Sequence, residues 1–309
     1  MKTITVVSGC YNEEGNLEEL FRRVGEVMGR FPAYAWEFII IDNCSTDRSP
    51  EILRRLAAET PRLKVIFNAR NFGHIRSPYH AMLQAQGDAV IYLASDLQDP
   101  PEHIADFIPK WEQGYKVVAA IKNESEESPM FFAMRRFYYA LIARLSDVDL
   151  LRNFTGFGLY DKVVNEHLRR LDDPYPYHRG IIAELGFPVA RVNFVQPRRK
   201  RGFTKNNFYT LYDTAMLGFT SHTKVPLRLA TMFGFATALV SFLIGLVYLA
   251  YKLVHWQEFT VGLAPVVVGL FFLGSVQLLF IGILGEYIGA IHTKVTKRPL
   301  VVESERINF

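Results

Sequence analysis

Two apolar runs that each end in polar residues decide the fold: residues 3–16 read TITVVSGCYNEEGN and residues 37–47 read EFIIIDNCSTD. Short runs rich in Val, Ile and Thr favour buried β-strands. Between the two runs, apolar side chains recur every three or four residues, at Leu17, Leu20, Phe21, Val24, Val27, Met28 and Phe31. That spacing is typical of a helix. The stretch therefore predicts a strand, a helix and a second strand.

The same alternation continues for about 120 residues. Ser49 and Pro50 are typical of a helix start, as are Pro100 and Pro101. A further helix is predicted at 81–86, and further strands at 64–67, 89–93 and 116–121. This order predicts an α/β fold with a mainly parallel sheet and helices on both faces. Ligands bind such sheets at the C-terminal strand ends. The glycine patterns of dinucleotide-binding and P-loop proteins are absent.

Half of the 309 residues are hydrophobic, and the apolar excess gathers in two uncharged runs, residues 229–251 and 259–285. A helix needs about 20 apolar residues to cross a bilayer. The runs contain 23 and 27 residues, so they predict a transmembrane hairpin rather than two buried core helices. The net charge of +4 does not indicate nucleic-acid binding, and two cysteines exclude a disulfide scaffold.

Basic residues flank the outer ends of the predicted hairpin, at Lys224, Arg228, Lys294, Lys297 and Arg298. The connector 252–258 carries only one lysine and one glutamate. The positive-inside rule therefore predicts that the N-terminal domain and both termini are cytoplasmic. The apolar stretch 4–9 is too short for a signal peptide. Glycines recur along the second run, and small residues let helices approach closely, which predicts a homo-oligomer.

These patterns divide the chain into four parts. Residues 1–205 are predicted to form the cytosolic domain, and residues 293–309 a cytosolic tail. Residues 227–292 are predicted to hold the two transmembrane helices, at about 229–252 and 260–286. Residues 206–226 have one apolar helical face, which fits a helix lying in the membrane interface or a helix packed on the core.

The polar clusters at the strand ends resemble those of family 2 glycosyltransferases, in the branch that loads sugars onto polyisoprenyl phosphate. That branch includes dolichyl-phosphate mannose synthases and the bactoprenol glucosyltransferases of O-antigen modification. The resemblance covers nearly the whole chain. It rests on residues 6–14 (VVSGCYNEE), 40–47 (IIDNCSTD), 70–73 (RNFG), 96–102 (DLQDPPE), 156–160 (GFGLY) and 199–205 (RKRGFTK), and on the hairpin.

The resemblance implies a GT-A-type fold in an integral protein of the bacterial cytoplasmic membrane. The chain departs from the family pattern at four positions. Asn43 replaces the second Asp of D-D-G-S, and Ala94 replaces the first Asp of D-x-D. Gly9 and Asn153 stand where Pro and Asp are common.

Two groups of residues are candidates for holding a nucleotide-sugar donor. Asp42 follows a strand and can accept from a base N–H or a ribose hydroxyl, with Asn43 beside it; a turn-forming role is the alternative. The resemblance implies that Tyr11 and Glu13 border the base and the ribose of the donor.

A leaving nucleoside diphosphate needs its charge neutralised, and hard oxygen ligands suit Mg²⁺ or Mn²⁺. Asp96 and Gln98 are the predicted catalytic and metal-ligating residues. Asp99 precedes Pro100 and is expected mainly to cap a helix.

The acceptor side is expected to be basic. A lipid phosphate is mostly a dianion at pH 7, so it needs orientation rather than a strong base. Candidate phosphate ligands are Lys122, Arg135, Arg136, Arg199, Arg201 and Lys205. The cluster 198–205 places five cations in eight residues, and it also fits binding to anionic headgroups.

We therefore expect an inverting transfer of a hexose, with UDP-glucose as the expected donor, to a polyisoprenyl phosphate such as undecaprenyl phosphate. GDP-mannose or a UDP-aminoarabinose-type donor is the alternative within the same chemistry. A processive synthase is disfavoured because its Q-x-x-R-W motif is missing. A non-catalytic membrane scaffold is motivated by Asn43 and Ala94. A transporter is disfavoured because the hairpin offers no ionisable pathway.

Overall fold

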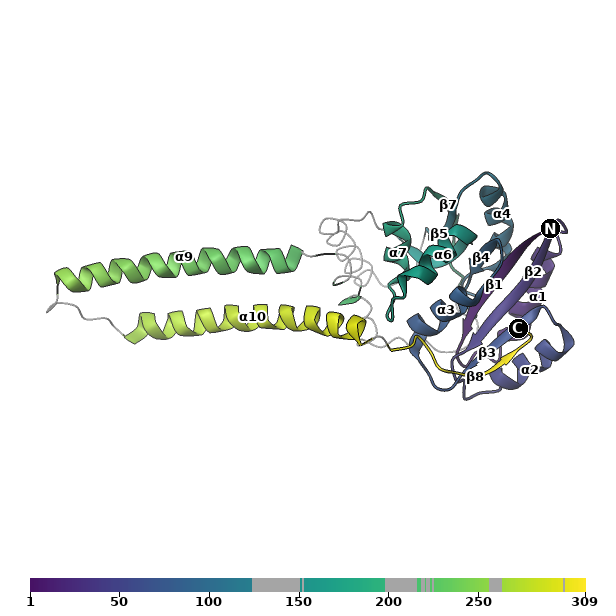
Figure 1. Cartoon of the computed structure of the whole chain (residues 1–309), viewed down its shortest axis with the longest axis horizontal. Helices are drawn as coiled ribbons and strands as arrows, with labels where there is room; N and C mark the ends of the chain where they lie inside the picture. The colour runs from purple at the N-terminus through teal and green to yellow at the C-terminus, as the bar shows by residue number, and fades with distance from the viewer. Residues whose placement is uncertain are drawn as a thin grey trace.

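The computed structural model places an α/β domain at one end of a long helical hairpin (Figure 1). It describes residues 1–123, 151, 153–197, 216–217, 220, 223, 225–255, 263–296 and 298–309. The helices are α1 (Leu17–Met28), α2 (Ser49–Glu59), α3 (Gly73–Gln84), the 3₁₀ turn η1 (Pro101–His103), α4 (Ile104–Glu112), α6 (Lys162–Leu171), α7 (His178–Glu184), α9 (Val225–Val254) and α10 (Leu263–Val295).

The described strands form one sheet in the order β7-β5-β6-β4-β1-β2-β3-β8. Strands β3, β2, β1 and β4 run parallel, whereas β6 is antiparallel to both β4 and β5. The mainly parallel α/β fold is therefore confirmed. The strands are β1 (Lys2–Cys10), β2 (Tyr34–Asp42), β3 (Leu63–Asn68), β4 (Ala89–Tyr92), β5 (Val117–Lys122), β6 (Phe154–Asp161), β7 (Val189–Phe194) and β8 (Glu303–Ile307).

Helices cover both faces of the sheet, as the sequence predicts. One hydrophobic core joins the sheet to α1, α2 and α4, and a second joins it to α3, α6 and α7. Successive strand residues alternate between the two: Val6 and Ile40 lie in the first core, Val7 and Ile41 in the second. The continuous apolar runs in these strands follow from burial on both faces.

The C-terminal segment completes the sheet, which the sequence analysis did not predict. Strand β8 pairs antiparallel with β3, and Val65 lies opposite Ile307. Asn308 donates two hydrogen bonds of 2.8 Å from Nδ2, to the carbonyl oxygens of Ala57 and Leu63. Residues that follow the hairpin are thus fastened to the N-terminal domain.

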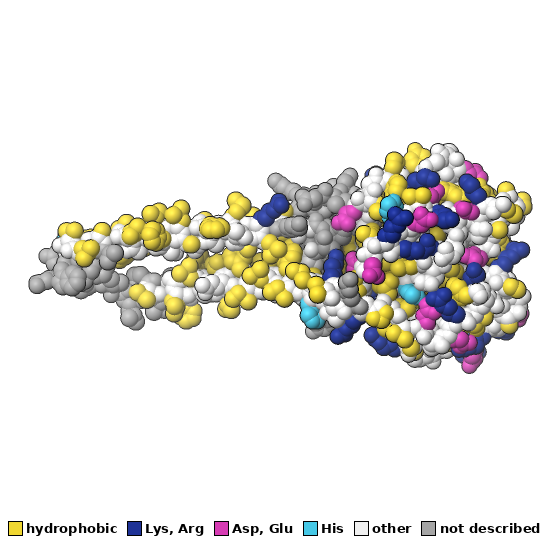
Figure 2. Space-filling model, viewed as in Figure 1, with side chains coloured by type: hydrophobic (Ala, Val, Ile, Leu, Met, Phe, Trp, Pro, Cys, Tyr) yellow, Lys and Arg dark blue, Asp and Glu magenta, His cyan; other side chains and the backbone are white. Residues whose placement is uncertain are grey.

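The two C-terminal helices do not enter either core of the domain. Figure 2 shows hydrophobic side chains along α9 and α10, and Phe235 and Leu270 are 74% and 70% exposed. Segments 225–248 and 269–295 are long and apolar enough to cross a membrane. Helix α9 extends beyond its predicted span at both ends, and α10 extends beyond its predicted span at the C-terminal end. That end of α10 reaches the domain, where Lys294 Nζ lies 3.5 Å from Asp173 Oδ2.

Strand β6 fits between β4 and β5 only because residue 158 has no side chain. A Cβ at Gly158 would lie 2.3 Å from the carbonyl oxygen of Val118, in β5. Gly158→Ala should therefore lower the free energy of unfolding by about 2–3 kcal/mol through overpacking. Thermal unfolding of the purified protein measures this.

Gly25→Ala is the matched control, because its Cβ would meet Trp36 at an ordinary 3.8 Å. This helical position should gain up to about 1 kcal/mol. Equal melting temperatures for the two variants would contradict the strand packing described here.

Candidate functional site

The loops that follow β1 and β2 are bound to each other by hydrogen bonds. Asn12 N–H donates to Ser45 Oγ at 2.8 Å, and Glu13 N–H donates to Ser49 Oγ at 3.0 Å. Asn12 has a left-handed backbone, with φ of 55°. Because Cys10 lies in register with Asp42, the candidates Tyr11, Glu13, Asp42 and Asn43 come together at one edge of the sheet.

Asp42 ends β2 and is 1% exposed. Its Oδ2 accepts the N–H of Ser45 at 3.0 Å, while its buried Oδ1 has no hydrogen-bond partner in the described part of the chain. Burial raises the pKa of this carboxyl, and the hydrogen bonds from Ser45 oppose the shift. An unsatisfied buried acceptor is costly, so this oxygen is suited to a ligand's N–H or O–H.

Asn43 joins the end of β2 to the segment that begins α3. Its Nδ2 donates to Asn71 Oδ1 at 2.9 Å and to the Gly73 carbonyl at 3.3 Å. Its Oδ1 accepts from Asn68 Nδ2 at 3.0 Å and from Phe72 N–H at 2.8 Å. An aspartate could not donate the first two bonds. The geometry thus makes Asn43 a positioning residue, and its contact with a nucleotide stays a prediction.

Asp96 and Gln98 lie on a tight turn after β4. Between them Leu97 is 6% exposed and has a φ of 61°, which is rare for a residue with a bulky side chain. Gln98 N–H donates to Asp96 Oδ1 at 3.1 Å, and the Gln98 side chain reaches the Pro197 carbonyl at 3.4 Å. Ser95 Oγ donates to the Gly9 carbonyl at 2.8 Å, which fastens this turn to the end of β1.

The expected capping role of Asp99 is wrong. Pro100 occupies the N-cap position of η1, and no side chain caps it. Asp99 is 4% exposed, and its Oδ2 accepts the N–H of Ala94 at 3.0 Å. The carboxylate points toward the end of β4 because the N–H of Ala94 is available there as a donor.

Asp99 lies among charges of both signs. Burial raises its pKa to about 7; the Ala94 hydrogen bond opposes the shift, Asp96 adds to it, and Arg179 and Lys122 also oppose it. Lys122, a predicted acceptor ligand, is therefore close to the carboxylates. The sequence analysis did not single out Arg179, which lies in the first turn of α7. No local sequence pattern marks this residue as functional.

The residues present can hold a divalent cation only with help from a substrate. In the ranges that the structure covers, no three His, Cys, Asp or Glu side chains form a cluster suited to a metal ion. Asp96 and Gln98 offer side-chain oxygens from the same turn of backbone. Mg²⁺ is commonly bound by one or two carboxylates together with substrate phosphates and water. The donor set fits that mode.

Five predicted acceptor ligands lie outside the described residues: Arg135, Arg136, Arg199, Arg201 and Lys205. So does most of the predicted interfacial segment 206–226.

Two family models match separate parts of the chain. Glycosyl transferase family 2 matches residues 5–169, and the GtrB C-terminal hairpin matches residues 225–291. An uncharacterized glycosyltransferase of Bacillus subtilis, YkcC, is 34% identical over 96% of this chain and 92% of its own. The bactoprenol glucosyl transferase of Shigella phage SfII is 32% identical over 99% of both chains.

Among solved structures, mannosyl-3-phosphoglycerate synthase from Rubrobacter xylanophilus superposes with a TM-score of 0.48 and 15% identity. That match covers 70% of this chain and 71% of the other.

The raised pKa of Asp99 predicts a pH-dependent stability. Between the ordinary value of 3.8 and about 7, the folded state keeps a proton that the unfolded state releases. The stability of the wild type should therefore fall as pH rises through this window. Asp99→Asn, which imitates the protonated acid, should be more stable than wild type at pH 8 by up to a few kcal/mol, and nearly equal at pH 4.

Thermal unfolding in detergent with EDTA, across pH 4–8, measures this difference. The exposed Asp106→Asn on α4 controls for the change in formal charge. Parallel pH profiles for wild type and Asp99→Asn would contradict the assigned environment.

Proposed function

The chain belongs to glycosyl transferase family 2, and on that basis we propose that it transfers a hexose from a nucleotide sugar to the phosphate of a polyisoprenyl lipid. The observation that carries the proposal is that the likeness includes both the N-terminal domain and the C-terminal hairpin. The match with a bactoprenol glucosyl transferase accordingly covers 99% of both chains. UDP-glucose and undecaprenyl phosphate are the proposed substrates. The name of that relative supports glucose as the transferred sugar and a bactoprenol lipid as the acceptor. The choice of uracil as the nucleobase of the donor rests on the same likeness.

The donor is proposed to bind across the ends of β1, β2 and β4. Asp42 would accept from the base or ribose through its unsatisfied Oδ1, with Tyr11 and Glu13 alongside. Asn43 would act mainly by holding the loop 70–73 in place. Asp96 and Gln98 would hold Mg²⁺ or Mn²⁺ together with the diphosphate. The ion, when bound, neutralises charge on the leaving group.

The transfer is proposed to invert the anomeric carbon. An oxygen of the lipid phosphate forms the new bond to that carbon, and the bond to the nucleoside diphosphate breaks, its electron pair leaving with the diphosphate. The dianionic acceptor needs no general base. It needs cations that hold it in line; the proposed ones are Lys122, Arg135, Arg136, Arg199, Arg201 and Lys205.

The domain and both ends of the chain are proposed to lie on the cytoplasmic side of the bacterial membrane. Pairing of β8 with β3 supports a common side, because the chain leaves the domain through α9 and returns to it after α10. We keep the proposed division into a catalytic part (1–205), an interfacial segment (206–226), a membrane hairpin (227–292) and a tail (293–309). The glycines of α10 support a homo-oligomer, because small residues let helices approach closely. If crosslinking in native membranes yields only monomer, this proposal is wrong.

A non-catalytic scaffold is the second candidate, favoured by Ala94 at a position where the family has a metal-binding aspartate. Transfer of sugar distinguishes the two candidates.

The test supplies the purified protein with Mg²⁺, undecaprenyl phosphate and radiolabelled UDP-glucose, and follows label into the organic phase. Wild type should form labelled lipid. Asp96→Ala should lower the rate at least about 100-fold, because it removes charge stabilisation of the leaving group, and EDTA should do the same. Asp106→Asn, exposed on α4, should retain the wild-type rate.

If wild type labels lipid only from another UDP- or GDP-sugar, the donor assignment is wrong and the reaction class stands. If no nucleotide sugar yields labelled lipid, the enzymatic proposal is wrong and the scaffold is favoured.

A further inference from the structure

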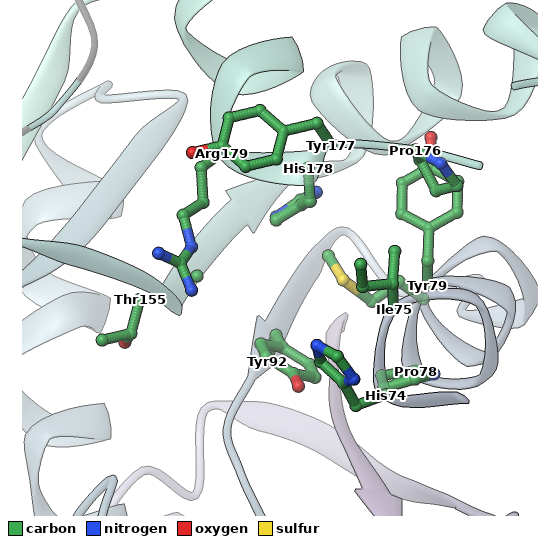
Figure 3. Close-up of a pocket in the computed structure, with 12 residues that line it drawn as sticks. His74, Ile75, Pro78, Tyr79, Tyr92, Thr155, Pro176, Tyr177, His178 and Arg179 are labelled. Carbon is green, nitrogen blue, oxygen red and sulfur yellow. The ribbon is translucent and has the colours of Figure 1, made fainter. Parts of the chain in front are cut away.

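A cavity of about 270 Å³ opens between α3 and α7, over the end of β4 and the start of β6 (Figure 3). Its volume is slightly below the roughly 300 Å³ at which pockets for drug-sized ligands begin. The space suits one small headgroup rather than a whole nucleotide sugar. None of the donor candidates Tyr11, Glu13, Asp42 and Asn43 lines it.

One side of the cavity carries a cation and unsatisfied polar groups. The Arg179 side chain extends into the space in the direction of Thr155 (Figure 3). Within the described residues, its guanidinium has neither a hydrogen bond nor an ion pair. Both ring nitrogens of the adjacent His178 are buried with no partner in that same part of the chain. Burial, and secondarily the Arg179 charge, lower the pKa of His178 to about 3, so the ring is neutral at pH 7.

The opposite side is largely apolar and comes from α3. Ile75, Pro78 and Met82 line it, together with the ring of Tyr79, and His74 of the same helix adds one polar ring (Figure 3). A sugar presents hydroxyl groups in all directions and would leave several of them unpaired against such a wall. An anion attached to a hydrocarbon chain matches both sides at once.

The cavity adjoins the carboxylates of the candidate site. Tyr92, at the end of β4, lines it and precedes the turn that carries Asp96. The charge of Arg179 also acts on Asp99. A group bound at Arg179 is therefore next to the turn on which the donor diphosphate is proposed to bind.

The cavity also lies on the side of the domain that faces the hairpin, where Figure 1 shows α7 and α3. Lys294, at the end of α10, pairs with Asp173 in the segment leading to α7. Arg76, which follows Ile75 on α3, donates to the carbonyl of Pro299. Both walls are thus tied to the point where the apolar helix ends, which is the level of lipid headgroups.

We propose that this cavity binds the head of the lipid acceptor, with Arg179 holding the phosphate and the α3 wall receiving the first isoprene units. The inference rests on the proposed function, and it adds Arg179, Ile75 and Met82 to the acceptor side. Guanidinium forks hold phosphate oxygens by paired, charge-assisted hydrogen bonds. The ligand class is a phosphate monoester that carries an apolar chain.

The first experiment measures binding without any sugar donor. Farnesyl phosphate is titrated into the full-length protein in detergent by calorimetry, with inorganic phosphate and farnesol as separate arms. Arg179→Gln should raise the Kd for farnesyl phosphate at least tenfold, as expected for loss of a charged hydrogen bond. Arg170→Gln, an exposed change of the same kind at the end of α6, should leave it unchanged.

A second variant tests the apolar wall. Ile75→Thr should weaken farnesyl phosphate several-fold and leave the binding of inorganic phosphate unchanged. Equal affinities of wild type for farnesyl phosphate and inorganic phosphate would overturn the lipid assignment in favour of a free-phosphate site. Unchanged farnesyl phosphate binding in a folded Arg179→Gln protein would overturn the proposal altogether.

Transfer kinetics separate this inference from the proposed function. Arg179→Gln should raise the KM for prenyl phosphate at least tenfold and change the KM for the donor less than twofold. An equal rise in the donor KM would instead assign Arg179 to the diphosphate. Lipid labelling with full activity in Arg179→Gln would refute the acceptor site alone, whereas prenyl phosphate binding without any transfer would refute the enzymatic proposal alone.

Discussion

The side-chain amide of Asn43 is the interaction on which the arrangement of the site depends. It lies at the end of β2, is 5% exposed, and binds Asn68 at the end of β3 and the backbone of Phe72 and Gly73. One group with two donors and an acceptor thus fixes the direction in which α3 leaves the sheet. Helix α3 in turn carries the apolar wall of the cavity. Asn68 and Asn71 complete the hydrogen bonds of the asparagine that stands in place of the family's aspartate.

Two carboxylates lie close together in the site, and two cations lie near them. The carboxylates of Asp96 and Asp99 lie on the turn after β4, and Arg179 and Lys122 act on them from α7 and the end of β5. Among the described residues Arg179 has no hydrogen bond to a carboxylate, so its donors are left for a ligand. Such an arrangement suits a reaction in which one phosphate departs and another attacks, since both need neutralisation and neither needs a strong base.

The sequence was sufficient for the parts of the fold that depend on local patterns. Apolar runs and helical spacing placed β1 to β4 and α1 correctly, because a strand buried on both faces needs a continuous apolar run and a helix buried on one face needs apolar residues every three or four positions. Strand β8 escaped prediction because its partner, β3, is remote in sequence and its exposed residues are mostly charged. Asp99 was misassigned because two prolines after it are typical of a helix start, while its actual donor, the N–H of Ala94, is set by the shape of the turn. Arg179 gave no signal, because its significance comes from the cavity that tertiary packing creates.

The pairing of β8 with β3 also bears on how the protein is made. The hydroxyl of Ser304 binds the carbonyl of Phe67, a residue 237 positions earlier. During synthesis β3 emerges first, and its outer edge stays without this partner until both helices of the hairpin have followed. An open strand edge is prone to pair with other chains. The unfinished chain is therefore exposed to aggregation through the outer edge of β3, and protection of this edge depends on the residues that follow α10.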